Sequence, residues 1–191
     1  MEQNKEMTAQ QSLSIIAENL NNSRRDILRG SAKHFILWGV ILTVFSLAIY
    51  LGWHFSGDPR WNFLWFAMPL IGYLLASILG KKDQGIPKSE LSRMIGGTWT
   101  AYGAFAICLS VIAVFIVPMH ITLLIVIILG LAECISGVLL KNWPIIIAGF
   151  ILGVGGAVFA MLVKSEAQLL IFTLGGALLA ITGLIVKHQY K

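Results

Sequence analysis

One acidic side chain lies within an apolar run where an ionised group is costly. Glu133 belongs to the stretch GLAECISG, residues 130–137, and precedes Lys141 by eight positions. At 1.5 Å per residue, Glu133 lies about 12 Å inside a helix that ends near Lys141. An ionised carboxylate at such a depth in lipid costs several kcal/mol on some scales. We therefore expect Glu133 either to be protonated or to be held by nearby hydrogen-bond donors.

Hydroxyl groups at a comparable depth are the natural donors. Tyr73 and Tyr102 lie about as far from the nearest lysine or arginine as Glu133 does, and Thr100 lies somewhat closer to that end. Tyrosine and threonine hydroxyls can donate to a carboxyl oxygen. The sequence therefore predicts an intramembrane polar site made of Glu133, Tyr73, Tyr102 and Thr100.

Two roles are open to such a carboxyl. An ionisable group inside a membrane is by default a candidate proton relay or cation site. A neutral acid that cross-links helices is the favoured reading, because no second membrane-embedded acid, lysine or arginine completes a pathway. Gly130 and Gly137 lie on the same side of the helix as Glu133, and small residues mark surfaces where membrane helices approach closely. We expect Glu133 to point into the bundle.

Other catalytic or metal-binding patterns are missing from the sequence. The stretch CISG resembles the GxSG motif of intramembrane serine proteases, but Cys134 replaces the first glycine and His188 lies past the end of the last apolar run. A serine without a base within reach is not activated. Nucleotide-binding, zinc and CxxC motifs are absent as well. We predict no enzyme activity, no metal and no cofactor.

The elements that carry these residues are membrane spans. The chain is 57% hydrophobic and 12% charged, with a mean hydropathy of +0.81, far from the composition of a soluble domain. About 20 apolar residues cross the hydrocarbon core as a helix. The sequence predicts an all-α polytopic membrane protein with six transmembrane helices at 34–54, 61–80, 94–117, 119–140, 144–163 and 167–187.

Prolines and small residues refine this arrangement. Pro118 separates the third and fourth spans, and Pro144 suits the first turn of the fifth. The GVGG stretch at 153–156 either loosens the fifth span, as in a transporter with a broken helix, or serves packing, which is favoured. Three small-residue faces are expected to pack closely against other helices: Gly149, Gly153 and Ala157; Gly176, Ala180 and Gly183; and Gly96, Thr100, Ala104 and Cys108.

The basic residues predict the orientation. With six spans, only Arg60 and Lys164 fall on one side of the membrane. By the positive-inside rule the richer side is cytoplasmic, so both termini are predicted to be cytoplasmic. Because these residues flank apolar runs instead of forming a phosphate-binding stripe, we predict no nucleic-acid partner. The richer side holds Lys5, Arg24, Arg25, Arg29, Lys33, Lys81, Lys82, Lys88, Arg93, Lys141, Lys187 and Lys191.

The segment before the first span is predicted to form an amphipathic helix over residues 12–29 that stops at Gly30. Its stripe has three alternative destinations: the inner membrane surface, a cytoplasmic protein partner or second copy, or the loop between the second and third spans. The membrane surface is favoured because basic residues attract anionic lipid. The stripe holds Leu13, Ile16, Ala17, Leu20, Ile27 and Leu28, and the basic residues are Arg24, Arg25, Arg29 and Lys33.

Longer stretches resemble known proteins. SLSIIAENLNNSRRDI, then FILWG at 35–39, ISGVLLKNWPIIIAGF at 135–150 and the following AQLLIFTLGG are similar to a family of small uncharacterised bacterial membrane proteins with six spans and an amino-terminal cytoplasmic amphipathic helix. The resemblance implies this fold, without an activity, substrate or cofactor. The family often ends its last span in a proline-glycine turn, whereas this chain has Thr182, Gly183 and Leu184, so no kink is expected there.

These observations divide the chain into three parts: a cytoplasmic segment at 1–33, a transmembrane domain at 34–187 and a cytoplasmic tail at 188–191. We expect a multi-pass protein of the bacterial inner membrane with a regulatory or scaffolding role through its cytoplasmic helix. The alternative is a small transporter or a subunit that resembles the permease of an ABC exporter and uses Glu133.

Overall fold

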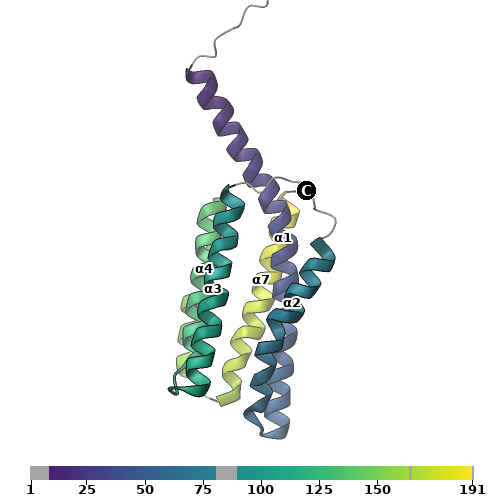
Figure 1. Ribbon diagram of the computed structural model, residues 1–191, viewed down its shortest axis with the longest axis vertical. Helices are drawn as coiled ribbons and strands as arrows, with labels where there is room; N and C mark the ends of the chain where they lie inside the picture. Colours follow the sequence, from purple (N-terminus) through teal and green to yellow (C-terminus); the bar gives the residue numbers. More distant parts are fainter. Residues whose placement is uncertain (1–8, 81–89, 164, 191) are drawn as a thin grey trace, which may run out of the picture.

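The computed structural model describes residues 9–80, 90–163 and 165–190, which form helices joined by short turns (Figure 1). The predicted all-helical class and six membrane spans are confirmed for these residues. Six helical segments are long and apolar enough to cross a membrane: Gln10–Ser56, Pro59–Ile78, Glu90–Phe115, Ile121–Leu140, Trp143–Leu162 and Ser165–Gln189.

The first helix, α1 (Ala9–Ser56), is continuous from the amino-terminal segment through the first span. The predicted stop at Gly30 is therefore wrong. Glycine inside a helix costs about 1 kcal/mol relative to alanine. Leu28, Ala32 and Phe35 on either side of it are buried in one cluster of the bundle core, and their packing offsets that cost.

The main partner of α1 is the last helix, α7 (Leu170–Gln189). The two backbones approach closely, because a Cβ atom added to Gly39 would lie 2.6 Å from the Gly176 carbonyl oxygen, and one added to Gly183 would lie 2.9 Å from that of Ala32. The prediction that the glycines of the last span form a close-packing face is confirmed.

The fourth and fifth spans form a tight hairpin. The fourth helix, α4 (Ile121–Leu140), is followed by Lys141, whose φ of 51° is left-handed. Asn142 then caps α5 (Trp143–Phe150) by accepting a hydrogen bond from the Ile145 amide at 3.3 Å. Proline in the first turn of α5 matches the expectation from the sequence, since its missing amide would be unsatisfied there anyway.

The fifth span continues beyond α5 as a π-helical segment, η3 (Ile151–Gly155), and then as α6 (Gly156–Leu162). The π-helical turn overlaps the GVGG stretch at 153–156, where glycines weaken the regular α-helical geometry. The span then turns through η4 (Ser165–Leu169) into α7.

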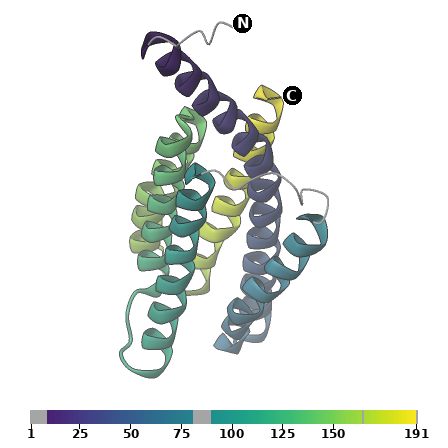
Figure 2. The same ribbon diagram turned by 45° about the horizontal axis from the view of Figure 1, so that its top comes forward.

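The second and third spans lie at the periphery. After a short turn, η1 (Pro59–Phe63), the second span forms α2 (Leu64–Gly80), and the third forms α3 (Glu90–Phe115). The helix α3 ends before Pro118 and α4 begins after it, as expected from the position of this proline. In both views α3 stands with α4 on one side of α7, and α2 stands with α1 on the other (Figures 1 and 2).

One predicted packing face, on the third span, is not used by the described part of the chain. A Cβ atom added to Gly96 would meet no atom within 4 Å. Thr100, Ala104 and Cys108 on the same face of α3 are exposed. The expectation that this face packs against another helix of the bundle is therefore wrong, because α3 contacts its neighbours through its opposite side, where Trp99 and Tyr102 pack on the core.

The core consists of two clusters of buried side chains, stacked along the bundle. The first cluster lies at the end from which α1 projects, and the second lies nearer the other end. The first contains Leu28, Ala32, Phe35, Leu140, Ile145, Leu179 and Val186. The second contains Leu42, Val126, Leu129, Leu152, Ile171 and Phe172.

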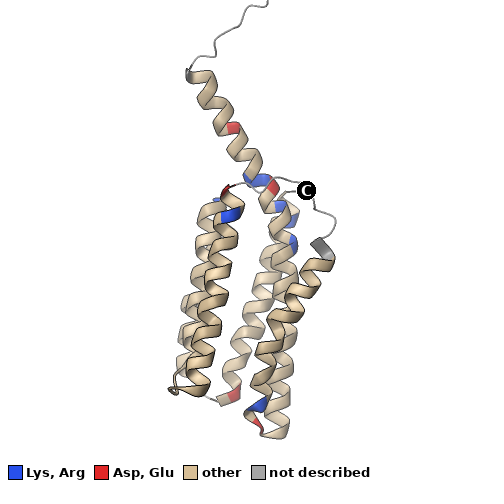
Figure 3. Ribbon diagram, in the orientation of Figure 1, with Lys and Arg blue, Asp and Glu red and all other residues tan. Residues whose placement is uncertain are grey.

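Charged residues lie mainly at the two ends of the bundle (Figure 3). Lysines and arginines gather at the end from which α1 projects. For the described residues this agrees with the prediction that basic residues concentrate in the loops on one side of the membrane. The side of the membrane that this end faces stays a prediction. Six of the residues used to predict orientation lie outside the described residues: Lys5, Lys81, Lys82, Lys88, Lys164 and Lys191.

Candidate functional site

Glu133 is held deep in the bundle by α4. Its side chain is 1% exposed, and it lies on the stripe of α4 that carries Val126, Leu129 and Leu140 into the two core clusters. These positions share one helix face because they are spaced by three, four and seven residues. The expectation that Glu133 points into the bundle agrees with this burial.

The backbones of α4 and of the fifth span, in α5 and η3, meet beside this carboxyl. A Cβ atom added to Gly130 would lie 2.4 Å from the Gly153 Cα, and one added to Gly149 would lie 2.7 Å from the Cys134 amide nitrogen. Helices that approach so closely leave little room between them. The carboxyl group is therefore enclosed on one flank by a dense helix crossing.

Neither oxygen of Glu133 has a hydrogen-bond partner among the described residues. Ser136, one turn along α4, donates instead to the Ala132 carbonyl at 2.8 Å. An ionised carboxylate that is buried without partners carries a large desolvation cost. Of the two states expected from the sequence, the neutral acid is the one that this environment tolerates.

Tyr73 lies on the outside of the bundle. Its side chain is 66% exposed. The Tyr73 ring packs edge-on against Trp38 of α1, with ring centroids 5.5 Å apart. Trp38 is drawn against α2 because Gly72 leaves space for its indole, at 2.4 Å from where a Cβ atom would stand. Tyr73 therefore joins α2 to α1 and forms no hydrogen bond with Glu133.

Tyr102 and Thr100 diverge on α3. The Tyr102 ring packs against the second core cluster and lies edge-on to Trp99 at 5.8 Å. Thr100 is exposed and donates to the Gly96 carbonyl of its own helix at 2.9 Å. The four residues of the predicted polar site thus share a depth in the chain, but the structure forms no hydrogen bond between Glu133 and any of the other three.

The basic residues before the first span lie on the part of α1 where this helix leaves the bundle. Arg29 donates from Nε to the Tyr190 carbonyl oxygen at 2.6 Å and so ties α1 to the end of α7. Arg25 and Lys33 are exposed, and Arg24 is half-buried. Arg29 therefore has a structural role beyond the lipid contact expected from the sequence.

The apolar stripe of the amino-terminal segment divides at this level. Ile27 and Leu28 pack into the first core cluster. Leu13, Ile16 and Leu20 are 66%, 55% and 51% exposed, on the part of α1 that extends beyond the bundle. The apolar stripe is therefore buried near the bundle and exposed beyond it.

Sequence reasoning missed an apolar cavity of about 300 Å³ between the fifth span and α7. One wall is formed by residues 151–159 and the other by residues 171–178. The GVGG stretch was a signal of irregular structure in this wall, but a cavity between two helices depends on how far apart they stand. No group of three or more histidine, cysteine or acidic side chains that could hold a metal ion occurs in the described chain.

Six apolar helices, several of which cross at glycines, define a multi-pass α-helical membrane protein. Comparison with models of protein families, with curated proteins and with solved structures finds no match to this chain. The class therefore rests on the helices themselves.

Proposed function

We propose that this chain is a non-enzymatic protein of the bacterial inner membrane that recruits a cytoplasmic protein partner through the projecting part of α1. The observation that carries the proposal is the exposure of Leu13, Ile16 and Leu20 on a helix that leaves the bundle. Apolar side chains at spacings of three and four residues form one stripe, which is how a helix presents itself to a partner groove.

The apolar stripe could bind either a protein partner or the membrane surface. The continuous course of α1 supports the protein partner. Leu28 is the first buried residue of α1, and the residues before it extend roughly 28 Å at 1.5 Å per residue. A helix lying on lipid must run parallel to the surface. The projecting part instead continues the spanning part and points away from the bundle (Figure 1). Laying the stripe on lipid would require a bend near Gly30.

The charge distribution supports the same choice. Residues 9–23 carry one charged side chain, Glu18, whereas the arginines begin at Arg24, next to the bundle. Electrostatic attraction to an anionic leaflet falls off within about 10 Å. The basic residues therefore suit anchoring at the base of the helix, while the nearly uncharged stripe suits a partner further out.

Two neighbouring isoleucines provide a matched test of this function. Ile15 and Ile16 are both exposed, but only Ile16 belongs to the stripe. We expect a photo-crosslinking residue at position 16 to form adducts with a cytoplasmic protein in intact cells, and the same residue at position 15 to form few. Ile16→Ser should weaken co-purification of that protein, whereas Ile15→Ser should not. Adducts of position 16 with lipid alone would refute the proposal, and adducts with a second copy would replace the partner by self-association.

The proposed orientation has its own test. Both termini are proposed to be cytoplasmic, as the clustered basic residues favour. A fluorescent protein that matures only in the cytoplasm, fused after residue 191, should fluoresce, and an alkaline phosphatase fused there should be inactive. The reverse pair of results would invert the topology and remove the cytoplasmic partner.

A second candidate is a small transporter that uses Glu133. The buried carboxyl without a hydrogen-bond partner favours it, because such groups are retained at proton-relay sites. Glu133→Gln keeps the size and hydrogen-bonding capacity of the side chain but removes its titration. A transporter should lose pH-dependent flux in proteoliposomes with this variant. A recruiting protein should keep its partner and its fold.

A further inference from the structure

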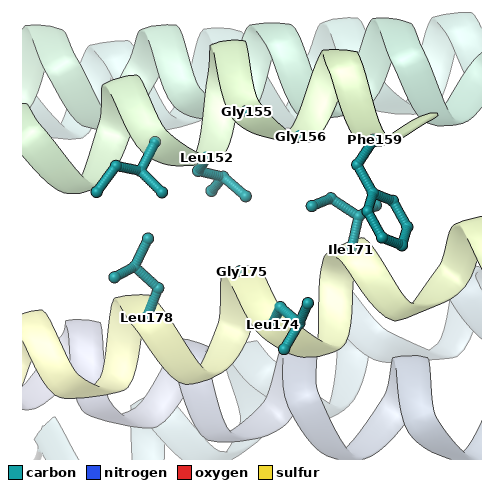
Figure 4. Close-up of a pocket in the computed structure, with 9 residues that line it drawn as sticks. Leu152, Gly155, Gly156, Phe159, Ile171, Leu174, Gly175 and Leu178 are labelled. Carbon is teal, nitrogen blue, oxygen red and sulfur yellow. The ribbon is translucent and has the colours of Figure 1, made fainter. Parts of the chain in front are cut away.

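The cavity between the fifth span and α7 has glycine in both walls, and Leu152 packs over one of them, because a Cβ atom added to Gly175 would lie 2.5 Å from the Leu152 Cδ1. Gly155 faces Gly175 across the gap, with Leu152 and Leu178 toward one end and Phe159 and Ile171 toward the other (Figure 4). A Cβ atom added to Gly155 would meet no atom within 4 Å. The gap is therefore open in front of Gly155, whereas the Leu152 side chain fills the space in front of Gly175.

The π-helical segment shapes one of these walls. Ile151, Leu152 and Gly155 belong both to η3 and to the lining of the cavity. On its other side η3 meets α4, where Gly153 lies against Gly130. Positions 153 and 155 are two residues apart and so lie on nearly opposite faces of the fifth span, which places one glycine against α4 and the other at the cavity.

The lining excludes water as the natural occupant. All nine lining residues are glycine or carry a hydrocarbon side chain, so the walls offer no side-chain hydrogen-bonding group. A water molecule needs two to four polar partners, and apolar cavities stay dry. An empty gap would forfeit dispersion contacts along both helices. Hydrocarbon matches the apolar walls of the cavity, and it is also the medium that surrounds the spans in a membrane.

The size of the cavity decides between two sources of hydrocarbon. The wall from Ile171 to Leu178 is about 10 Å long at 1.5 Å per residue. A helix of this length, with a diameter of about 10 Å, occupies roughly 800 Å³. The cavity holds about 300 Å³. A helix of a second copy could therefore only lie across the opening of the cavity, whereas a single extended alkyl chain is much narrower than a helix and fits inside it.

We infer that this cavity binds one acyl chain of a phospholipid. The chain enters from the leaflet on the side of η4, because the cavity follows the last turns of the fifth span and the first turns of α7. Near that end Gln168 donates to the carbonyl oxygens of Ala160 and Val163, at 3.0 and 2.8 Å, and so braces the turn beside the cavity. The bound chain completes the packing between the fifth span and α7.

Two glycines allow a matched test. Gly155 and Gly103 both lie on helices that face lipid, and a Cβ atom at either meets nothing within 4 Å. Only Gly155 lines the cavity. Gly155→Leu should fill the cavity and Gly103→Leu should not. Native mass spectrometry of the full-length protein in micelles, with added palmitoyl-oleoyl phosphatidylglycerol, measures the phospholipid retained.

We expect the lipid-bound fraction to fall roughly tenfold in Gly155→Leu. The reason is that excluding about two methylene groups of the acyl chain from an apolar site weakens the affinity by about that factor. It should stay unchanged in Gly103→Leu. Leu174→Phe, from the opposite wall, should reproduce the loss, and circular dichroism should show both variants folded. Equal retention by all variants would overturn the inference. A change of oligomeric state in Gly155→Leu without loss of lipid would overturn it in favour of a second copy.

Discussion

Two features inside the bundle contrast sharply. Glu133 is a polar group without space, since it is 1% exposed and lies beside a glycine crossing. The cavity between the fifth span and α7 is a space without polar side chains. They lie on opposite sides of the fifth span, which contacts α4 through Gly153 and lines the cavity through Gly155.

The contrast bears on what the membrane domain can do. A transport site needs a polar group and a passage at the same place, because a buried charge is tolerated only where partners or water meet it. In the described part of this chain the two requirements are met at different places. This separation supports the proposal that the bundle holds α1 in position, with the inferred acyl chain completing its packing, over the transporter alternative.

The largest expected effect tests how tightly α4 and the fifth span pack at the glycine crossing beside Glu133. Gly130→Ala places a methyl group 2.4 Å from the Gly153 Cα, where only backbone can yield. We expect the free energy of unfolding to fall by about 3 kcal/mol, the upper range for overpacking. Titration with dodecyl sulfate in mixed micelles measures it. A change smaller than that of a surface substitution would mean that the helices can separate and make room for a passage.

A smaller effect of opposite sign tests whether Glu133 lacks partners. Glu133→Met replaces the carboxyl by an apolar group of similar length, and removes a polar group that is buried without hydrogen bonds. We expect the free energy of unfolding to rise by about 2 kcal/mol, the usual cost of such a group. The same titration measures it, with Ser136→Ala as a control on the same helix. Destabilisation by Glu133→Met would reveal a partner for the carboxyl.

The smallest expected effect tests two glycines, Gly103 and Gly155, that face open space. Gly103→Ala and Gly155→Ala each add a methyl group where no atom lies within 4 Å. We expect both to raise the free energy of unfolding by about 0.5 to 1 kcal/mol, because alanine favours the helix over glycine. Thermal unfolding in delipidated micelles checks this. If Gly155→Ala were destabilising there, η3 would need glycine for its π-helical turn.

The candidate site shows how far sequence reasoning reached. Burial of Glu133 followed from its depth and from its flanking glycines, and it was confirmed. The hydrogen bonds expected from Tyr73 and Tyr102 were not formed, because equal depth says nothing about direction around a helix. Tyr73 turns toward Trp38 in the gap left by Gly72, a contact between α2 and α1 that no local pattern encodes.

The six spans and their breaks were determined by the sequence alone, because lipid tolerates only long apolar helices, and Pro118 and Pro144 restrict the backbone locally. Tertiary structure decided which faces meet. Small residues recur in α3, in the fifth span and in α7, yet only those of the last two meet another backbone. Periodicity gives the angle of a residue around its own helix, but the neighbour at that angle, or the cavity left there, depends on where the other helices stand.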